Sequence, residues 1–248
     1  MPELESRTFV IGDIHGAYAA LEPLIRRLPL EKEDVLVFLG DYVDGWSESK
    51  EVIDYLLELG RTRKCIFIKG NHDAWFQEWL EGALPDPSWL LHGGLSTLES
   101  YRGVSAAGAL AHLNFLRELR FYHVDASNRL FIHAGFTSPH GPEREHFKST
   151  LTWDRTLWEM ALAADEKIPQ EAPRFPKRLR LYKEIFLGHT PTTNYDVTVP
   201  MRGCNVWNMD TGAAFTGRIS AMDVETKECL QSEIVQSLYP NEKGRNII

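Results

Sequence analysis

The chain has 248 residues, 43% of them hydrophobic and 25% charged, which is typical of a folded globule and excludes wholesale disorder. Its net charge of −8 argues against nucleic acid as a partner, because the phosphate backbone is negative as well. No apolar run approaches the roughly 18 residues that a membrane helix needs. Residues 1–5 lack a secretory signal and the three cysteines are scattered, so we expect a cytoplasmic protein with no membrane partner.

The first 75 residues repeat one pattern three times: an apolar run, then a glycine with polar neighbours, then a helical stretch. The apolar runs cover residues 8–11, 35–39 and 65–68, and such runs are typical of strands buried on both faces. Apolar residues at helical spacing predict helices that include residues 21–28 and 52–59. Alternation of strand and helix in this way predicts a mostly parallel sheet.

The remainder of the chain shows no linker that would separate a second domain. We expect one domain over residues 1–236 and a polar tail over residues 237–248. Residues 138–181 are rich in Pro, Glu and Arg and are predicted to be irregular, and their role stays open. Helices are predicted over 73–81 and 109–118, and strands over 121–124, 129–132, 185–187, 206–209 and 217–224.

Polar residues beside glycines follow five of the predicted strands. The carboxyl ends of strands in an open α/β sheet form the crevice where ligands bind. One such residue alone is usually a turn residue or a helix cap, but crowded carboxylates at one edge would repel without a cation. The five segments are Gly12-Asp13-Ile14-His15-Gly16, Gly40-Asp41-Tyr42-Val43-Asp44, Gly70-Asn71-His72-Asp73, His133-Ala134-Gly135 and Gly188-His189-Thr190.

The residue types in these segments indicate the kind of metal. Mixed aspartate, histidine and asparagine ligation without cysteine indicates Mn, Fe or Zn. Two metals that share a carboxylate, about 3.5–4 Å apart, form the usual arrangement for hydrolysis of phosphoesters. The strand ends therefore predict a site of that kind.

In this order and spacing, the five segments resemble the signatures of the metallophosphoesterase superfamily. They are most similar to the phosphoprotein phosphatase (PPP) branch, in its compact bacterial and phage-lambda-phosphatase form, and the resemblance extends from Phe9 to Asp210. It implies an α/β fold of central mixed β-sheets, a β-sandwich flanked by helices on both sides, so that residues 1–236 form a calcineurin-like domain. It also implies two divalent metal ions, first of all Mn, with Fe or Zn as alternatives.

The resemblance further implies the roles of individual residues. His72 would be the general acid that protonates the leaving alcohol, oriented by Asp44, and Arg155 would grip the phosphoryl oxygens. A metal-bridging hydroxide would attack phosphorus in line. The implied ligands are Asp13 and His15 for the first metal, Asp41 as the bridge, and Asn71, His133 and His189 for the second metal.

Two positions depart from the family pattern. The second signature normally continues with Asp-Arg-Gly, but here Asp44 is followed by Gly45 and Trp46, so one phosphate-binding arginine is missing. What compensates for it stays open. Lys69 stands where the lambda-type enzymes carry another arginine, and it supplies charge without a planar fork. We expect Lys69 to bind substrate and Trp46 to line the rim of the pocket.

Three other features have structural and functional interpretations. The basic run within 174–183 could meet an acidic or phosphorylated substrate, or form a solvated face. Trp75, Phe76 and the neighbouring Trp79 are interpreted as core residues on one helix, and His92 as a turn residue that could lie near the site.

The favoured function is hydrolysis of phosphomonoesters, first of all as a serine/threonine protein phosphatase, with dual specificity as an extension to phosphotyrosine. The substrate would be a phosphorylated protein or a small phosphoester. One alternative is a symmetrical bis(5'-nucleosyl)-tetraphosphatase, and another is a non-catalytic metal-dependent binding module. Asp44 and Thr190 favour the phosphatase, because the tetraphosphatases usually have a non-acidic residue and an aromatic residue at these positions. The physiological substrate, the native metal and the oligomeric state stay open.

Overall fold

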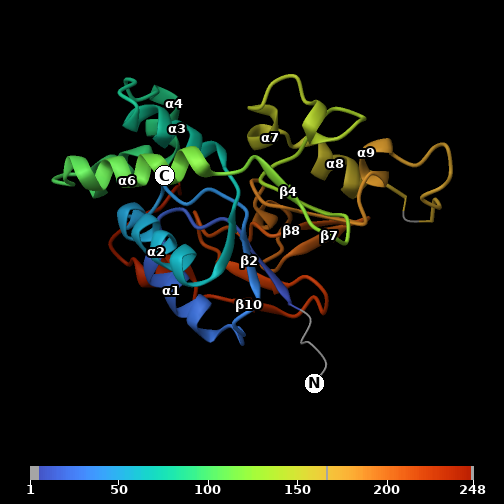
Figure 1. The fold of residues 1–248 in the computed structure, drawn as a ribbon, viewed down its shortest axis with the longest axis horizontal. Helices are drawn as coiled ribbons and strands as arrows, with labels where there is room; N and C mark the ends of the chain where they lie inside the picture. Colours follow the sequence, from blue (N-terminus) through green and yellow to red (C-terminus); the bar gives the residue numbers. More distant parts are fainter. Residues whose placement is uncertain (1–5, 166, 247–248) are drawn as a thin grey trace.

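Two mixed sheets face each other in the computed structural model, which describes residues 6–165 and 167–246 (Figure 1). The first sheet has the strand order β10-β9-β1-β2-β3. Strands β1, β2 and β3 are parallel, and β9 and β10 extend the sheet in antiparallel fashion. Its strands are β1 (Thr8–Ile11), β2 (Val35–Phe38), β3 (Lys64–Phe67), β9 (Ser220–Asp223) and β10 (Cys229–Gln231).

The second sheet has the order β4-β5-β6-β8-β7. Its three middle strands, β5, β6 and β8, are parallel, and the two edge strands are antiparallel to their neighbours. Each sheet therefore contains three adjacent parallel strands. The strands are β4 (Tyr122–Val124), β5 (Arg129–Ile132), β6 (Glu184–Leu187), β7 (Met201–Gly203) and β8 (Val206–Asn208).

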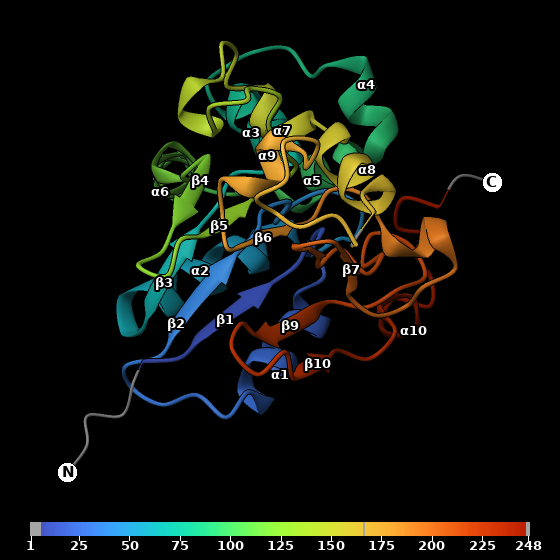
Figure 2. The same cartoon turned by 90° about the vertical axis from the view of Figure 1, so that its right-hand side faces the viewer.

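Helices cover the outer face of each sheet. The helices α1 and α2 pack on the first sheet, and α8 and α9 pack on the second, where Figure 2 shows them together above β6 and β7. The helices are α1 (Tyr18–Arg27), α2 (Ser49–Thr62), α3 (Asn71–Leu80), α4 (Pro87–Trp89), α5 (Leu95–Ser100), α6 (Ala106–Glu118), α7 (Thr150–Trp153), α8 (Thr156–Ala163), α9 (Lys177–Arg180) and α10 (Val235–Leu238), with short turns of π- or 3-10-helix at η1 (Leu90–Gly94), η2 (Pro142–Arg144) and η3 (Thr192–Tyr195).

Side chains alternate between the two faces of each strand, as the strand period of two requires. In β1, Phe9 and Ile11 pack against the helices, while Val10 faces the other sheet. Phe131 of β5 and Phe186 of β6 also lie between the sheets, where their rings stack with centroids 5.2 Å apart. This four-layer arrangement confirms the predicted fold class, a β-sandwich with helices on both sides.

The predicted elements differ from the structure in places where side-chain pattern is weak. The edge strands β7 and β10 are not predicted, because each has only three residues and lacks a continuous apolar run. The prediction that residues 138–181 are irregular is wrong for α8, whose Leu157, Trp158 and Ala161 pack into the core of the second sheet.

The segment predicted to be a polar tail packs onto the domain in its described part, residues 237–246. Tyr239 is buried and stacks on Trp46, with ring centroids 5.1 Å apart. Residues 247–248 of that segment, and residues 1–5 at the other end of the predicted domain, lie outside the described residues. Among the helices that the structure describes, none has the length and apolar character needed to cross a bilayer.

Candidate metal centre

The polar segments gather where the parallel strands of both sheets end. Asp13 and His15 follow β1, Asp41 follows β2, and Asn71 and His72 begin α3 directly after β3. The second sheet contributes its residues in the same way, because loops after β5 and β6 turn toward the same edge. The backbone N–H of His189 donates to Asp13 Oδ2 at 3.1 Å, so residues 176 positions apart in the chain are in contact. All eight residues with a predicted metal or acid role are buried: Asp13, His15, Asp41, Asp44, Asn71, His72, His133 and His189.

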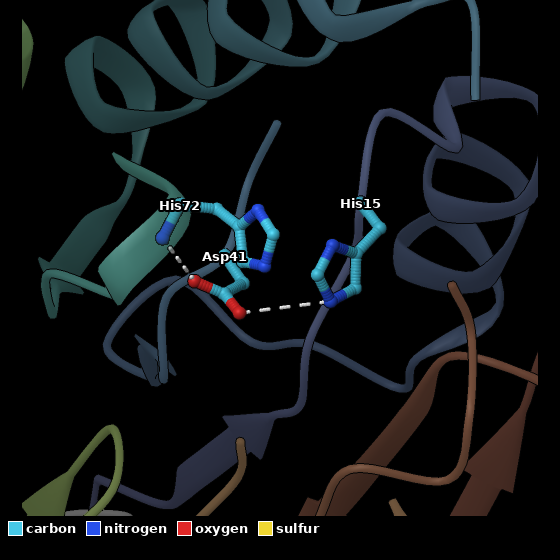
Figure 3. Close-up of side chains that lie close together, drawn as sticks. All are labelled: His15, Asp41 and His72. Atoms are coloured by element: carbon cyan, nitrogen blue, oxygen red, sulfur yellow. Dashed lines mark hydrogen bonds and ion pairs between the residues drawn. The ribbon is translucent and has the colours of Figure 1, made fainter. Parts of the chain in front are cut away.

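Asp41 lies between two groups of potential ligands. One group is His15, Asp41 and His72, and the other is Asp41, His133 and His189, with the ligand atoms of each group within 4.8 Å of one another. Figure 3 shows the first group, in which His15 Nε2 faces one oxygen of the Asp41 carboxylate and the backbone N–H of His72 donates to the other at 3.0 Å. Asp41 Oδ2 is 3.6 Å from His15 Nε2 and 3.4 Å from His133 Nε2. A carboxylate in this position has the geometry of a ligand shared by two cations.

Several polar atoms of the cluster lack partners. Asp13 Oδ1, His15 Nδ1 and His189 Nε2 are buried without a hydrogen bond to any described residue. Buried polar atoms are nearly always paired, so these three indicate room for a ligand. His133 Nδ1 bonds to the Leu39 carbonyl oxygen at 2.9 Å, so the ring turns its Nε2 toward Asn71 Oδ1 at 3.2 Å and Asp41 Oδ2 at 3.4 Å. This donor set fits a pair of divalent cations.

The electrostatics of the cluster also fit a cation. Burial raises the pKa of Asp13 well above its ordinary value, and the nearby Asp210 and Asp41 raise it further. Burial opposes ionisation of Asp41 as well, but the neighbouring His133 and His72 outweigh this and hold its pKa well below the ordinary value. Carboxylates crowded in a buried space repel one another, and a bound cation would remove that repulsion.

The backbone is held in an unusual conformation at four of these residues. The φ values are 55° at His15, 51° at Asp41, 73° at Asp44 and 67° at His189. These values lie in the left-handed region, which residues other than glycine rarely adopt. Hydrogen bonds between the loops support this conformation, for example from His15 N to the Asp41 carbonyl oxygen at 2.8 Å. Backbone strain of this kind concentrates at functional sites, where the surrounding structure maintains it.

His72, a member of the first ligand group, forms a buried pair with Asp44. His72 Nδ1 is 2.6 Å from Asp44 Oδ2, and the same carboxylate accepts hydrogen bonds from Trp89 Nε1 and Thr97 Oγ1, each at 2.6 Å. Burial raises the pKa of Asp44 to about 8 and lowers the pKa of His72 to about 3. Sequence reasoning missed Trp89 and Thr97, since they lie 45 and 53 positions beyond Asp44 and belong to no motif.

A cavity of about 290 Å³ opens next to the cluster. We call its buried strand-end residues the cavity floor and its half-buried or exposed loop and helix residues the cavity rim. The floor consists of Asp41, Asn71, His72, His189 and Asp210, and the rim of Trp75, His92, Trp153, Arg155, Pro191, Asn194, Phe215 and Arg245.

Aromatic rings form part of the rim. Trp75 stacks with His92 at a centroid distance of 6.1 Å, and Trp153 meets Trp75 edge-on at 4.9 Å. Trp75 packs against the core of the first sheet, as interpreted, but it is only half-buried and also lines the cavity, whereas Phe76 beside it is fully buried. His92 bonds through Nδ1 to the Ser88 carbonyl oxygen and also lines the cavity.

The three predicted substrate-binding residues lie in different places. Arg155 lines the cavity, as expected from its assignment. Lys69 does not belong to the described lining: its Nζ bonds to Gln77 Oε1 and lies 5.6 Å from the Phe121 ring, so the ammonium is directed into a neighbouring recess.

The prediction that Trp46 lines the pocket rim is wrong. Its side chain is fully buried, it stacks on Tyr239, and its Nε1 donates to the Ala213 carbonyl oxygen at 2.8 Å. An indole gains more from burial against apolar neighbours than from exposure at a rim, provided that its N–H has an acceptor. The loop after Asp44 therefore turns Trp46 inward.

Sequence reasoning also missed two charged residues of the lining, Asp210 and Arg245. Asp210 comes two residues after the end of β8, in the same position relative to its strand as the other motifs, and that placement could have identified it. Burial raises the pKa of Asp210 to about 6. Arg245 lies near the end of the chain, far from every motif, and no sequence signal connects it with the site.

Two facing mixed sheets, whose strand ends gather aspartate, asparagine and histidine around one shared carboxylate, define a metallophosphoesterase. The chain belongs to the calcineurin-like phosphoesterase family, whose model matches residues 6–216. This confirms the predicted superfamily, and similarity to a serine/threonine phosphatase supports its PPP branch.

The relatives include enzymes with two kinds of substrate. The chain is 29% identical to a symmetrical bis(5'-nucleosyl)-tetraphosphatase of Coxiella burnetii (strain CbuG_Q212), covering 89% of each chain. It is 24% identical to serine/threonine-protein phosphatase 1 of Salmonella typhimurium, covering 88% of this chain and 91% of that one. The fold is similar to that of a protein serine/threonine phosphatase from Saccharomyces cerevisiae, with a TM-score of 0.58 at 16% identity over 88% of this chain and 73% of that one.

Proposed function

We propose that this phosphoesterase hydrolyses phosphomonoesters, with phosphoserine and phosphothreonine in proteins as the favoured substrates. One observation carries the proposal: Asp41 lies between two ligand groups at the floor of a cavity that is also lined by His72, which pairs with the buried Asp44. Asp13 and His15 on one side, and Asn71, His133 and His189 on the other, would complete two cation sites around Asp41.

The cations supply the part of the chemistry that these side chains lack. Two divalent ions would neutralise phosphoryl oxygens and lower the pKa of a shared water. Mn, Fe and Zn all suit the donor set, and Mn is the metal we would try first.

The pair of His72 and Asp44 favours a phosphate ester of an alcohol as the substrate over a dinucleoside tetraphosphate. A serine or threonine alkoxide is a poor leaving group, so its departure needs a proton from a positioned acid. Asp44 holds His72 Nδ1 at 2.6 Å and so sets the orientation of the ring. Burial lowers the pKa of His72, and an ionised Asp44 beside the ring would counter this and favour the protonated imidazole that the acid role requires. A nucleotide leaving group carries its charge on phosphate and needs little protonation, so such a buried pair would be of less use to a tetraphosphatase.

Arg155 extends the site beyond the metal ligands. Its guanidinium lines the cavity, and no ion pair with a carboxylate holds it within the described residues. A planar guanidinium fits two phosphoryl oxygens at once, so we assign Arg155 to phosphate binding.

A second candidate is hydrolysis of dinucleoside tetraphosphates. It is favoured by the aromatic rings of Trp75, His92 and Trp153 on the rim, because a nucleobase stacks well on aromatic side chains. The relative from Coxiella burnetii carries that activity in its name, which supports the same candidate.

Turnover of matched substrates separates these functions. The protein would be freed of metal, reloaded with Mn²⁺, and assayed with phosphoserine, phosphothreonine and phosphotyrosine peptides and with diadenosine tetraphosphate. We expect the highest kcat/KM for phosphoserine or phosphothreonine peptides, and hydrolysis of phosphotyrosine at a comparable rate would indicate dual specificity. Preference for diadenosine tetraphosphate would support the second candidate. If metal binds but none of these substrates is hydrolysed, the protein is a binding module instead.

A further inference from the structure

The last described residues return to the cavity and place an arginine beside the loop after β2. A Cβ added at Gly45 would lie 3.4 Å from Arg245 Cγ, and one added at Gly93 would lie 3.1 Å from the same atom. Both glycines have φ values of +106°, where other residues are strained. The stem of Arg245 therefore occupies a slot between two positions that have no side chain.

The segment that carries Arg245, residues 239–246, is tied to the same loop; we call it the C-terminal strap. Tyr239 stacks on Trp46, and Glu242 accepts hydrogen bonds from the backbone N–H and the hydroxyl of Ser47 at 3.0 and 2.7 Å. The backbone N–H of Arg245 donates to the Ala214 carbonyl oxygen at 2.8 Å. The residues that replace the family's Arg-Gly, Gly45 and Trp46, thus make room for the strap and anchor it.

The charged end of Arg245 makes no direct ion pair with a described residue, although Asp44 and Asp210 lie near enough to interact with its charge. Its Nε is buried and has no hydrogen-bond partner, and within the described residues no carboxylate forms an ion pair with its guanidinium. The guanidinium lies 5.4 Å from the centroid of the Phe215 ring and lines the same cavity as Arg155. A partly buried cation without a partner is costly, and an anion bound in the cavity would remove that cost.

We propose that Arg245 is a phosphate-binding residue, which brings from the C-terminal strap the guanidinium that position 45 lacks. This inference rests on the proposed function, since it takes the anion to be the phosphoryl group of the substrate. Arg155 and Arg245 then bind phosphoryl oxygens from two separate loops. An arginine placed directly at position 45 could not do the same here, because its backbone would be strained and its stem would meet that of Arg245.

Inorganic phosphate is the probe that tests this. We would compare the Mn²⁺-loaded wild-type protein with Arg245→Met, which keeps an unbranched stem in the slot and removes the charge, and with Arg245→Lys. Lys243→Ala is the matched control, because it removes an exposed cation of the same strap. Calorimetry measures the binding of phosphate. Hydrolysis of p-nitrophenyl phosphate gives KM and the inhibition by phosphate. The folding and the metal content of each variant are measured in parallel.

We expect Arg245→Met to weaken phosphate binding and raise KM by about 10- to 100-fold, the usual worth of a charge-assisted pair. Arg245→Lys should recover part of the loss, and Lys243→Ala should stay within about twofold, because an exposed charge contributes little. Metal content should be unchanged throughout. If Arg245→Met does not fold, Arg245→Lys decides alone, and its phosphate affinity should still fall below that of the wild type.

Two results would overturn the inference: a folded Arg245→Met variant that binds phosphate as the wild type does, or a wild-type protein that binds no phosphate. Failure of the proposed function would look different. A wild-type protein that hydrolyses no phosphomonoester but binds phosphate, with weaker binding in Arg245→Met, would refute the phosphatase assignment and retain Arg245 as an anion-binding residue.

Discussion

The cavity floor and the cavity rim are built in different ways. Floor residues such as Asp41 and His189 follow strands directly, are buried, and have backbones held in the left-handed region by bonds between neighbouring loops. Rim residues such as Arg155 and Arg245 are half-buried or exposed and come from segments outside the strand ends. The difference indicates that the strand ends position the candidate metal ligands, while the loops and the C-terminal strap supply the charged and aromatic groups around them.

The strongest test of this division is Asp41→Asn in the floor. An amide cannot serve two cations as a carboxylate does, so we expect both metal sites to lose occupancy and activity to fall by about 10⁴-fold or more, over 5 kcal/mol of transition-state stabilisation. Metal content after dialysis is the direct measurement. Asp196→Asn is the control, since Asp196 is exposed and has a similar φ of 58°. A variant that keeps both metals would show that Asp41 is not shared.

His72→Asn tests the acid in the same floor. We expect kcat on alkyl phosphates to fall by about 10²–10⁴-fold, the usual span for a positioned proton donor. The loss should be smaller for p-nitrophenyl phosphate, whose leaving group needs little protonation. Steady-state kinetics on both substrates checks this, with the exposed His140→Asn as control. Equal losses on the two substrates would mean that His72 serves the metals rather than the leaving group.

Arg155→Ala moves the test to the rim. We expect phosphate binding to weaken by about 10- to 100-fold, as for loss of one charge-assisted pair, while metal content stays the same. Inhibition by inorganic phosphate measures the loss of phosphate affinity. Arg61→Ala is the control, because the Arg61 side chain is 72% exposed and lies outside the cavity. A loss of metal in Arg155→Ala would contradict the separation between rim and floor.

The Trp46→Phe substitution weakens the packing between the loop after Asp44 and the C-terminal strap, and Trp46 itself does not line the cavity. The variant loses the hydrogen bond from Nε1 to the Ala213 carbonyl oxygen and part of the contact with Tyr239. We expect the free energy of unfolding to fall by about 1–2 kcal/mol, measured by urea denaturation. Phosphate affinity should fall with it, since the strap carries Arg245; unchanged stability would mean that the strap is held elsewhere.

The smallest expected effect is a change in the pH dependence of stability on substitution of Asp34, which lies outside the cavity floor and the cavity rim. Burial opposes its ionisation, but hydrogen bonds from the Arg7 side chain at 2.6 Å and from backbone N–H groups hold its pKa below the ordinary value. A folded-state pKa below the unfolded one stabilises the protein at neutral pH, and that contribution is lost as the pH falls through the folded value. The acid-side loss of stability should therefore be smaller in Asp34→Asn, which denaturation at several pH values below neutral would show. Asp13 differs because burial and the nearby Asp210 outweigh the attraction of His133 and raise its pKa, whereas the Arg7 contacts outweigh burial at Asp34.

Much of the floor could be predicted from the sequence. Apolar runs followed by glycine and a polar residue identify the ends of β1, β2, β3, β5 and β6, and parallel strands bring such ends to one edge. The same reasoning extended to β8 would have identified Asp210. The fold class followed from the same runs together with the family resemblance, whereas the edge strands and α8 left too weak a pattern.

The sequence by itself determined which side chains could bind the metals. A residue placed directly after a strand lies at the end of the sheet, and the strand and the turn that follows it are both encoded in a short stretch of sequence. Only the tertiary structure decided the rim. It turned Trp46 into the core, directed Lys69 away, and brought Arg245 to within contact distance of a loop 200 positions earlier in the chain. Such contacts depend on how distant segments pack against each other, and no local pattern of residues records that.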